Sequence, residues 1–264
     1  MKRSAGRRVL LSLSSASTSA RLYWLWAIVH MSQCPTNPAS RHAGKRSPEP
    51  PRGMRIFLLS PANVAGIRAG LVMHENRDSE MGIRLRQDGV PLGELFSFMS
   101  GLYFRGKLAY ARAFALAPPG LSGAFVITAS GGLISPDTLV TLDRLREISA
   151  ANIDPADPRY RVPLDRDARI LSEWADLECE VVLLGSVATA KYVDPLVEVF
   201  GGRLLFPAEF VGRGDMSRGG LMLRCVESGE QLTHIPVVNA TRHGLKAPKL
   251  KPLARKVLTR FSTQ

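Results

Sequence analysis

Three short apolar runs, each followed by small polar residues, constrain the fold of this chain more than any other feature. They cover residues 55–60, 124–128 and 181–184. Strands that are apolar at successive positions are typical of parallel sheets covered by helices on both faces. A fourth short strand is expected at residues 203–207.

Segments with helical spacing of apolar residues separate these strands. We expect helices over residues 91–115, 141–150, 164–177 and 191–200. The alternation predicts a three-layer α/β/α fold with a mainly parallel sheet. Residues 221–226 and 231–238 are predicted to add a C-terminal β-hairpin that turns at Ser228-Gly229.

Basic residues are concentrated at the two ends of the chain. Residues 1–53 hold nine Lys and Arg against one acidic residue, and residues 242–264 hold seven against none. Residues 54–241 hold 19 basic and 22 acidic residues. We therefore expect a disordered basic N-terminal extension (1–53), a single α/β domain (54–241) and a basic C-terminal tail (242–264). Basic ends can neutralise phosphates, which makes nucleic acid a candidate partner.

Two interpretations of residues 1–53 remain open. The segment is rich in Arg and Ser and poor in acids, as targeting segments are, or the start codon is assigned too early and Met54 begins the protein. Serines interrupt the apolar residues that a secretory signal would need, and the apolar run at residues 22–31 is too short for a membrane span. We expect a cytoplasmic protein without a membrane partner.

Motifs for metals and cofactors are missing from the sequence. Cys34, Cys179 and Cys225 are far apart, and no Cys-x-x-Cys or His-Glu-x-x-His spacing occurs. The phosphate loop Gly-x-x-x-x-Gly-Lys-Ser/Thr and a dinucleotide fingerprint after the first strand are missing too. We expect no metal and no cofactor.

The residues after the predicted strands are candidates for ligand binding, because ligands of open α/β sheets bind outside the carboxyl ends of the strands. These candidates are Ser60 and Asn63 after the first strand, Ser130 and Gly131 after the second, and Ser186 after the third. Glycine allows close approach of the backbone, and Ser and Asn offer neutral hydrogen bonds. Strand-to-helix turns also favour such residues without any ligand.

Lysine is scarce in the predicted domain. Residues 54–241 contain 17 Arg but only Lys107 and Lys191. Lys191 begins a predicted helix directly after the third strand's loop, where it can hold a phosphate or polarise a substrate oxygen. A solvated helix start is the alternative. Tyr103, on the long helix with Lys107, is expected in the core.

Residues 210–220 combine four glycines with two arginines. Flexible backbone amides and guanidinium groups suit phosphate or carboxylate, so Arg213, Ser217 and Arg218 are candidate ligand-binding residues. Asp215 is the candidate catalytic residue, as a base or an electrostatic stabiliser kept ionised by nearby arginine. The alternative is a mobile surface loop.

The domain from Met54 resembles an uncharacterised bacterial protein family. The stretches that carry this resemblance are MRIFLLSPAN (54–63), GELFSFMSGLYFRGKLAYARAFA (93–115), VVLLGSVATAKYVDPL (181–196) and LLFPAEFVGRGDMSRGGLMLRC (204–225). More distantly, the order of parts resembles α/β domains of the uracil-DNA-glycosylase type, through Tyr103-Phe104, Ser130-Gly131-Gly132-Leu133 and Gly185. This second resemblance implies a site for a nucleobase or nucleotide. The catalytic Asp and His of those enzymes match no residue here.

The sequence therefore predicts an α/β protein that binds a nucleoside, a nucleotide or a related phosphorylated ligand. Glycosidic hydrolysis and group transfer are the candidate reactions, although no general acid–base pair is visible. A nucleic-acid-binding module that uses the basic tail and the Arg/Gly segment is an alternative, which the acidic balance of residues 54–241 disfavours. A structural partner protein is another. Neither the substrate, the oligomeric state nor enzymatic activity follows from the sequence.

Overall fold

The computed structural model describes residues 53–74, 79–175, 177–248 and 250. The chain divides into two compact units, one of residues 1–45 with 119–121 and one of residues 46–118 with 122–264. All helices and strands named below belong to the second unit. The predicted extension lies outside the described residues except for Gly53, and the predicted tail is described only up to residue 248 and at residue 250.

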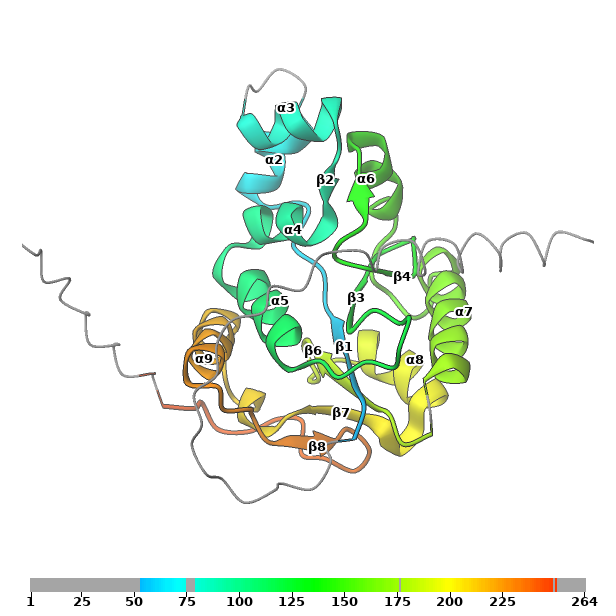
Figure 1. Ribbon diagram of the computed structural model, residues 1–264, viewed down its shortest axis with the longest axis vertical. Coiled ribbons are helices and arrows are strands. Elements are labelled where there is room, and N and C mark those ends of the chain that lie inside the picture. The colour runs from blue at the N-terminus through cyan, green and yellow to red at the C-terminus, as the bar shows by residue number, and fades with distance from the viewer. Residues whose placement is uncertain (1–52, 75–78, 176, 249, 251–264) are drawn as a thin grey trace, which may run out of the picture. The chain divides into compact units, whose positions relative to one another are not determined.

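Strands and helices are interspersed along the described chain (Figure 1). The strands are β1 (Arg55–Leu59), β2 (Val90–Pro91), β3 (Ala124–Ile127), β4 (Leu133–Ile134), β5 (Leu139–Val140), β6 (Glu180–Leu184), β7 (Leu204–Pro207) and β8 (His234–Pro236). The helices are α2 (Ile67–Met73), α3 (Glu80–Gln87), α4 (Leu92–Ser100), α5 (Leu102–Phe114), α6 (Leu142–Ile148), α7 (Pro158–Trp174), α8 (Ala190–Phe200) and α9 (Asp215–Ser228), with 3-10 turns η1 (Gly201–Arg203) and η2 (Ala208–Phe210).

The main sheet is mostly parallel, as predicted. Its strand order is β4-β3-β1-β6-β7-β8, and β2 pairs with β5 in a separate two-stranded sheet. β1 pairs in parallel with β3 and β6, and β6 pairs in parallel with β7. The edge strands β4 and β8 are antiparallel to their neighbours. The predicted α/β class is therefore confirmed.

The central strands are buried on both faces, which explains why they are apolar at successive positions. Residues 56–59 of β1 are fully buried. Phe57 and Leu59 belong to the core cluster that includes residues of α4, α5 and α9, so Ile56 and Leu58 are buried on the opposite face. Figure 1 shows α5 and α9 on one side of the strands and α7 and α8 on the other.

The predicted C-terminal hairpin does not form from the predicted residues. Residues 221–226 belong to helix α9, and only β8 within residues 231–238 is a strand, antiparallel to β7. Gly219, Met222 and Cys225 are the buried residues of α9, and their spacing of three is helical. Gly229 ends the helix in the left-handed region, with φ of 73°.

Two helix boundaries also differ from the prediction. The helix expected over residues 91–115 is two helices, because Gly101 adopts φ 62° and ψ −127° between α4 and α5, a conformation that favours glycine. Helix α7 begins at Pro158 instead of Leu164. The carboxylate of Asp157 accepts a hydrogen bond from the backbone N–H of Arg159 (2.9 Å), and proline suits the first turn.

Helices α5 and α9 touch through their backbones at two glycines. A Cβ atom placed on Gly106 would lie 2.6 Å from the carbonyl oxygen of Gly219. One placed on Gly219 would lie 2.7 Å from the carbonyl oxygen of Leu102. Real Cβ atoms do not approach so closely, so this crossing requires glycine on both helices. The sequence suggested that the glycines of residues 210–220 form a flexible loop. One of them, Gly219, is instead required by this helix crossing.

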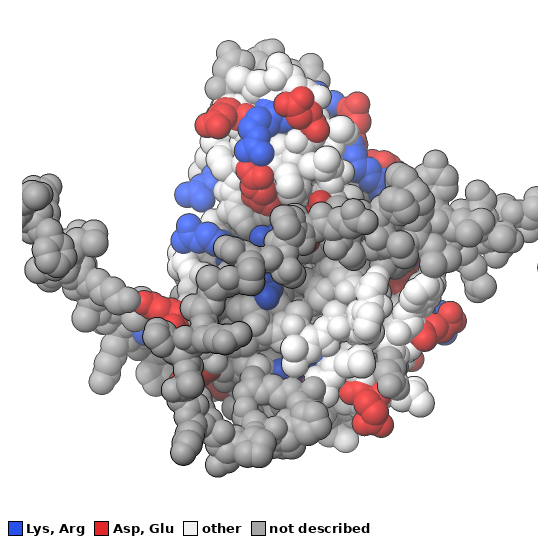
Figure 2. Space-filling model, viewed as in Figure 1, with Lys and Arg blue, Asp and Glu red and all other residues white. Residues whose placement is uncertain are grey.

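Charges of both signs are interspersed on the face shown in Figure 2, over the region of α2 to α4. One ion pair there joins Arg84 of α3 to Glu94 of α4 at 2.6 Å. This part of the surface therefore lacks the single-sign patch that is typical of phosphate-backbone binding. Among the described helices, none has both the length and the apolar character needed to cross a membrane.

The glycine crossing gives a test of the packing. The substitution Gly219→Ala should lower the free energy of unfolding by about 1–3 kcal/mol, because the new methyl group overpacks the backbone of α5. Gly220→Ala, one residue further along the same helix, is the matched control. Its Cβ would meet only the side chain of Leu250 at 3.4 Å, so it should be neutral or stabilise by up to ~1 kcal/mol. Urea denaturation measures both, and equal effects would contradict the crossing.

Candidate functional site

A pocket lies at the carboxyl ends of β1, β3 and β6. After β1 the chain continues to β3 on one side, and after β6 it continues to β7 on the other side. The strand order therefore reverses direction between β1 and β6. In open α/β sheets this reversal creates the crevice in which ligands bind.

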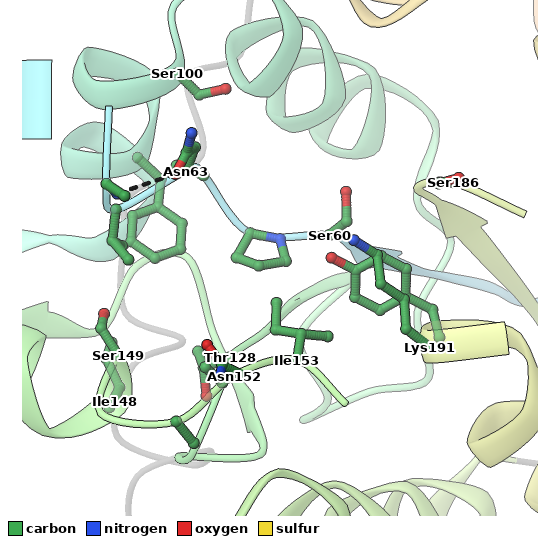
Figure 3. Close-up of a pocket in the computed structure, with 18 of the residues that line it drawn as sticks. Ser60, Asn63, Ser100, Thr128, Ile148, Ser149, Asn152, Ile153, Ser186 and Lys191 are labelled. Atoms are coloured by element: carbon green, nitrogen blue, oxygen red, sulfur yellow. Dashed lines mark hydrogen bonds between the residues drawn. The ribbon is translucent and has the colours of Figure 1, made fainter. Parts of the chain in front are cut away.

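The cavity has a volume of about 580 Å³ and is lined by segments far apart in the sequence. The lining residues are Ser60, Pro61, Ala62, Asn63, Val64, Ala65, Phe96, Ser100, Tyr103, Thr128, Ala129, Ile148, Ser149, Ala151, Asn152, Ile153, Ser186, Lys191, Tyr192 and Asp215. Figure 3 shows the labelled side chains around the open space, from several separate loops and helices.

The structure brings five of the ten predicted site residues to this pocket. They are Ser60, Asn63, Ser186, Lys191 and Asp215. Four of them come from the predicted loops after the first and third strands or from the helix that follows. Asp215 was expected in a loop, but it is the first residue of α9.

Ser130 and Gly131 do not line the pocket, because the chain turns back after β3 to form the antiparallel strand β4. The hydroxyl of Ser130 donates to the carbonyl oxygen of Glu147 (2.5 Å). The N–H of Gly131 donates to the hydroxyl of Thr128 (3.0 Å). Thr128 and Ala129 occupy the pocket wall instead.

Arg213, Ser217 and Arg218 also lie outside the lining of the pocket. Arg213 donates to the hydroxyl of Ser217 (3.0 Å) and to the carbonyl oxygen of Glu209 (3.2 Å). Arg218 donates through Nε and Nη2 to the carbonyl oxygen of Phe210, at 3.2 and 2.9 Å. Arg218 also forms an ion pair with the pocket residue Asp215 at 3.3 Å. These guanidinium groups therefore bind oxygens of their own chain.

Sequence reasoning missed a buried cluster directly behind the pocket wall, formed by Ser60, Tyr103 and Lys107 (the Ser60 cluster). Lys107 is fully buried. Its Nζ donates to the carbonyl oxygen of Ser60 at 2.5 Å and to the Ser60 Oγ at 2.8 Å. It also lies 4.4 Å from the centre of the Tyr103 ring and 4.9 Å from that of Phe104.

Burial lowers the pKa of Lys107 to about 7, because the charged ammonium loses its hydration. Asp215 opposes this shift and Arg218 adds to it. Within the described residues, no carboxylate lies close enough to Lys107 for an ion pair. Close to neutral pH, the amine is therefore present in both its charged and its neutral form.

Tyr103 brings a buried hydroxyl to the same cluster. The side chain is 9 % exposed, and its hydroxyl has no hydrogen-bond partner among the described residues. Burial raises the pKa of Tyr103 to about 12, with a further contribution from Asp215, while Arg218 and Ser60 oppose the rise. The phenol therefore stays protonated at neutral pH.

One sequence signal for this cluster existed. Lys107 is one of only two lysines in residues 54–241. It falls on the same helical face as the buried residues Tyr103, Tyr110 and Phe114. A lysine on an apolar stripe is unusual, because lysine is almost never fully buried.

Neither a metal site among the described residues nor a comparison with known proteins indicates the function of this pocket. Among the described residues, no group of three or more His, Cys, Asp or Glu side chains could hold a metal ion. Comparisons of the chain with protein-family models, curated proteins and solved structures find no match. The function is therefore inferred from the pocket itself.

The buried lysine gives a prediction for stability. Between pH 7 and 10.5 the unfolded chain holds the Lys107 proton and the folded chain has lost it, so folding is favoured as the pH rises. The free energy of unfolding of the native protein, minus that of Lys107→Met, should increase by up to ~1.4 kcal/mol per pH unit in this window. Below pH 7 the difference should be constant. Denaturant titrations across pH measure it, and a pH-independent difference would show that Lys107 keeps its ordinary pKa.

Proposed function

We propose that the pocket binds a nucleoside, a nucleotide or a related phosphorylated small molecule. The observation that carries this proposal is the placement of five predicted site residues around one cavity of about 580 Å³ at the strand reversal between β1 and β6. Such a volume is typical of small-molecule sites. The resemblance to uracil-DNA-glycosylase-type domains implies the same ligand class.

The start of α8 suits an anionic group of the ligand. Lys191 is the second residue of this 11-residue helix and the one lysine or arginine among the lining residues. The side chain of Thr189 makes no capping hydrogen bond, and the first turn holds no acidic residue. Backbone N–H groups and the helix dipole therefore favour a phosphate there, with Lys191 as its counter-charge.

The remaining lining suits a base and a sugar. Phe96, Tyr103 and Tyr192 offer aromatic surface. The Asn63 Oδ1 accepts from the N–H of Ala65 (2.9 Å), which leaves its NH₂ group for a ligand (Figure 3). Asp215 can accept hydrogen bonds from ribose hydroxyls, as acidic residues do in dinucleotide folds.

The described lining does not favour a common glycosidase mechanism. Asp215 is the single carboxylate among the residues that line the pocket. Most glycoside hydrolases need two carboxyl groups that flank the scissile bond. The pocket lining therefore supports binding of this ligand class, but not glycoside hydrolysis by two carboxylates.

We also propose the three-layer α/β/α arrangement for this domain. Complete burial of Ile56 and Leu58, which face away from the core cluster of α4, α5 and α9, supports a second helical layer. Helices α7 and α8 pack on each other, and α8 contacts β7. They are the helices that would form this layer.

Thermal unfolding with a ligand panel tests the proposed ligand. Adenosine, uridine, AMP, UMP and inorganic phosphate should be compared. A ligand at 100 times its Kd stabilises the native state by about 2.7 kcal/mol, which is a clear rise in melting temperature. Lys191→Ala should weaken the rise for the nucleotides more than for the nucleosides. Arg105→Ala, whose side chain lines a different cavity, is the control and should leave the rise unchanged. No rise with any compound, or equal rises in both variants, would contradict the proposed site.

A further inference from the structure

Ser60 stands where a nucleophile of an α/β enzyme would stand. It is the first residue after β1, at the carboxyl edge of the sheet, and it lines the pocket. Its Oγ accepts a hydrogen bond from the Nζ of Lys107 at 2.8 Å, and its hydroxyl donates to the carbonyl oxygen of Leu184 at 3.4 Å. When the amine is neutral, the same 2.8 Å separation lets Nζ accept the hydroxyl proton instead. A serine hydroxyl within hydrogen-bond reach of a basic side chain is the usual geometry of an activated nucleophile.

Lys107 can serve as that base only if it is neutral. A lysine in water is protonated at neutral pH and cannot accept a proton. Here the amine is fully buried, within the described residues it has no ion-pair partner, and its pKa falls to about 7. The groups that act on it are Tyr103 on its own helix and Asp215 and Arg218 on α9.

We propose that Ser60 and Lys107 form a nucleophile–base pair that cleaves an ester or amide bond of a ligand bound in the pocket. This inference rests on the proposed function only in requiring that the pocket admits a small molecule. It does not depend on the nucleoside nature of the ligand.

The reaction is an acyl transfer in two steps. The Ser60 Oγ attacks the carbonyl carbon, and its proton passes to the neutral Lys107 Nζ. The bond to the alcohol or amine leaving group then breaks, and that group takes the proton from Lys107 as it leaves. Water next attacks the acyl-Ser60 ester with Lys107 again accepting the proton, which releases the acid and restores the Ser60 hydroxyl.

Two neighbours support this chemistry. Tyr103 has a buried hydroxyl without a hydrogen-bond partner among the described residues, beside Ser60, and it can donate to the oxyanion that develops during the attack. Gly185 leaves the room that Ser60 occupies, since a Cβ on Gly185 would lie 3.0 Å from the Cβ of Ser60. The backbone N–H of Ser60 donates to the carbonyl oxygen of Leu184 at 3.2 Å, which ties Ser60 to the end of β6.

Covalent labelling of the full chain tests the pair without knowledge of the substrate. Phenylmethylsulfonyl fluoride reacts with an activated serine, forming an oxygen–sulfur bond and releasing fluoride while the base takes the proton. Mass spectrometry should find the adduct on Ser60, and the labelling rate should rise with pH and level off near pH 7–8. Lys107→Met should lower this rate by about 10²-fold or more. Ser60→Ala should abolish the adduct.

Controls make the result decisive. Ser97→Ala, at a serine that lines a different cavity, should label like the native protein. If Lys107→Met does not fold, the pH profile of the native protein decides, since a rate that keeps rising to pH 10 excludes a base with a pKa near 7. Absence of an adduct on Ser60, or an unchanged rate in folded Lys107→Met, overturns the pair. If Ser60 is labelled but no nucleoside or nucleotide stabilises the protein, the proposed ligand is rejected and the Ser60–Lys107 pair is kept. If a nucleoside or nucleotide stabilises the protein but Ser60 is not labelled, the pair is rejected and the proposed ligand is kept.

Discussion

The contact between Gly106 and Gly219 sets the geometry on which the rest of the site depends. It brings the backbones of α5 and α9 together more closely than any side chain would permit. Lys107 follows directly after the first glycine, and Arg218 directly precedes the second. The same crossing therefore places the buried amine behind Ser60 and, on the other helix, the two charges that act on it, Arg218 and Asp215.

The parts of the fold that local sequence determines could be predicted. Runs of apolar residues predicted β1, β3, β6 and β7, because strands buried on both faces have no polar positions. The prediction failed at α9, where glycines suggested a flexible loop followed by a strand. Their role there is close packing against α5, which depends on a helix more than 100 residues away in the sequence and has no local signature.

Which residues line the pocket could also be predicted only in part. Position after a strand located Ser60, Asn63 and Ser186, since the topology alone brings such residues to one edge of the sheet. The same rule failed at Ser130, because the chain forms a hairpin there and uses the hydroxyl for its own backbone. Lys107 could not be placed, because its partner Ser60 lies 47 residues away.

The pocket lining includes loop residues, whereas the Ser60 cluster beneath it is tightly packed. This difference determines which positions can change in sequence. The cluster is bounded by the backbone contact of Gly106 with Gly219, where no larger residue fits, and by the close approach of Gly185 to the Ser60 side chain. Asn63, Ser149 and Asn152 lie on loops that carry no such restriction. Sequence change in these loops could therefore alter the lining of the pocket while the amine and hydroxyl beneath it stay in place.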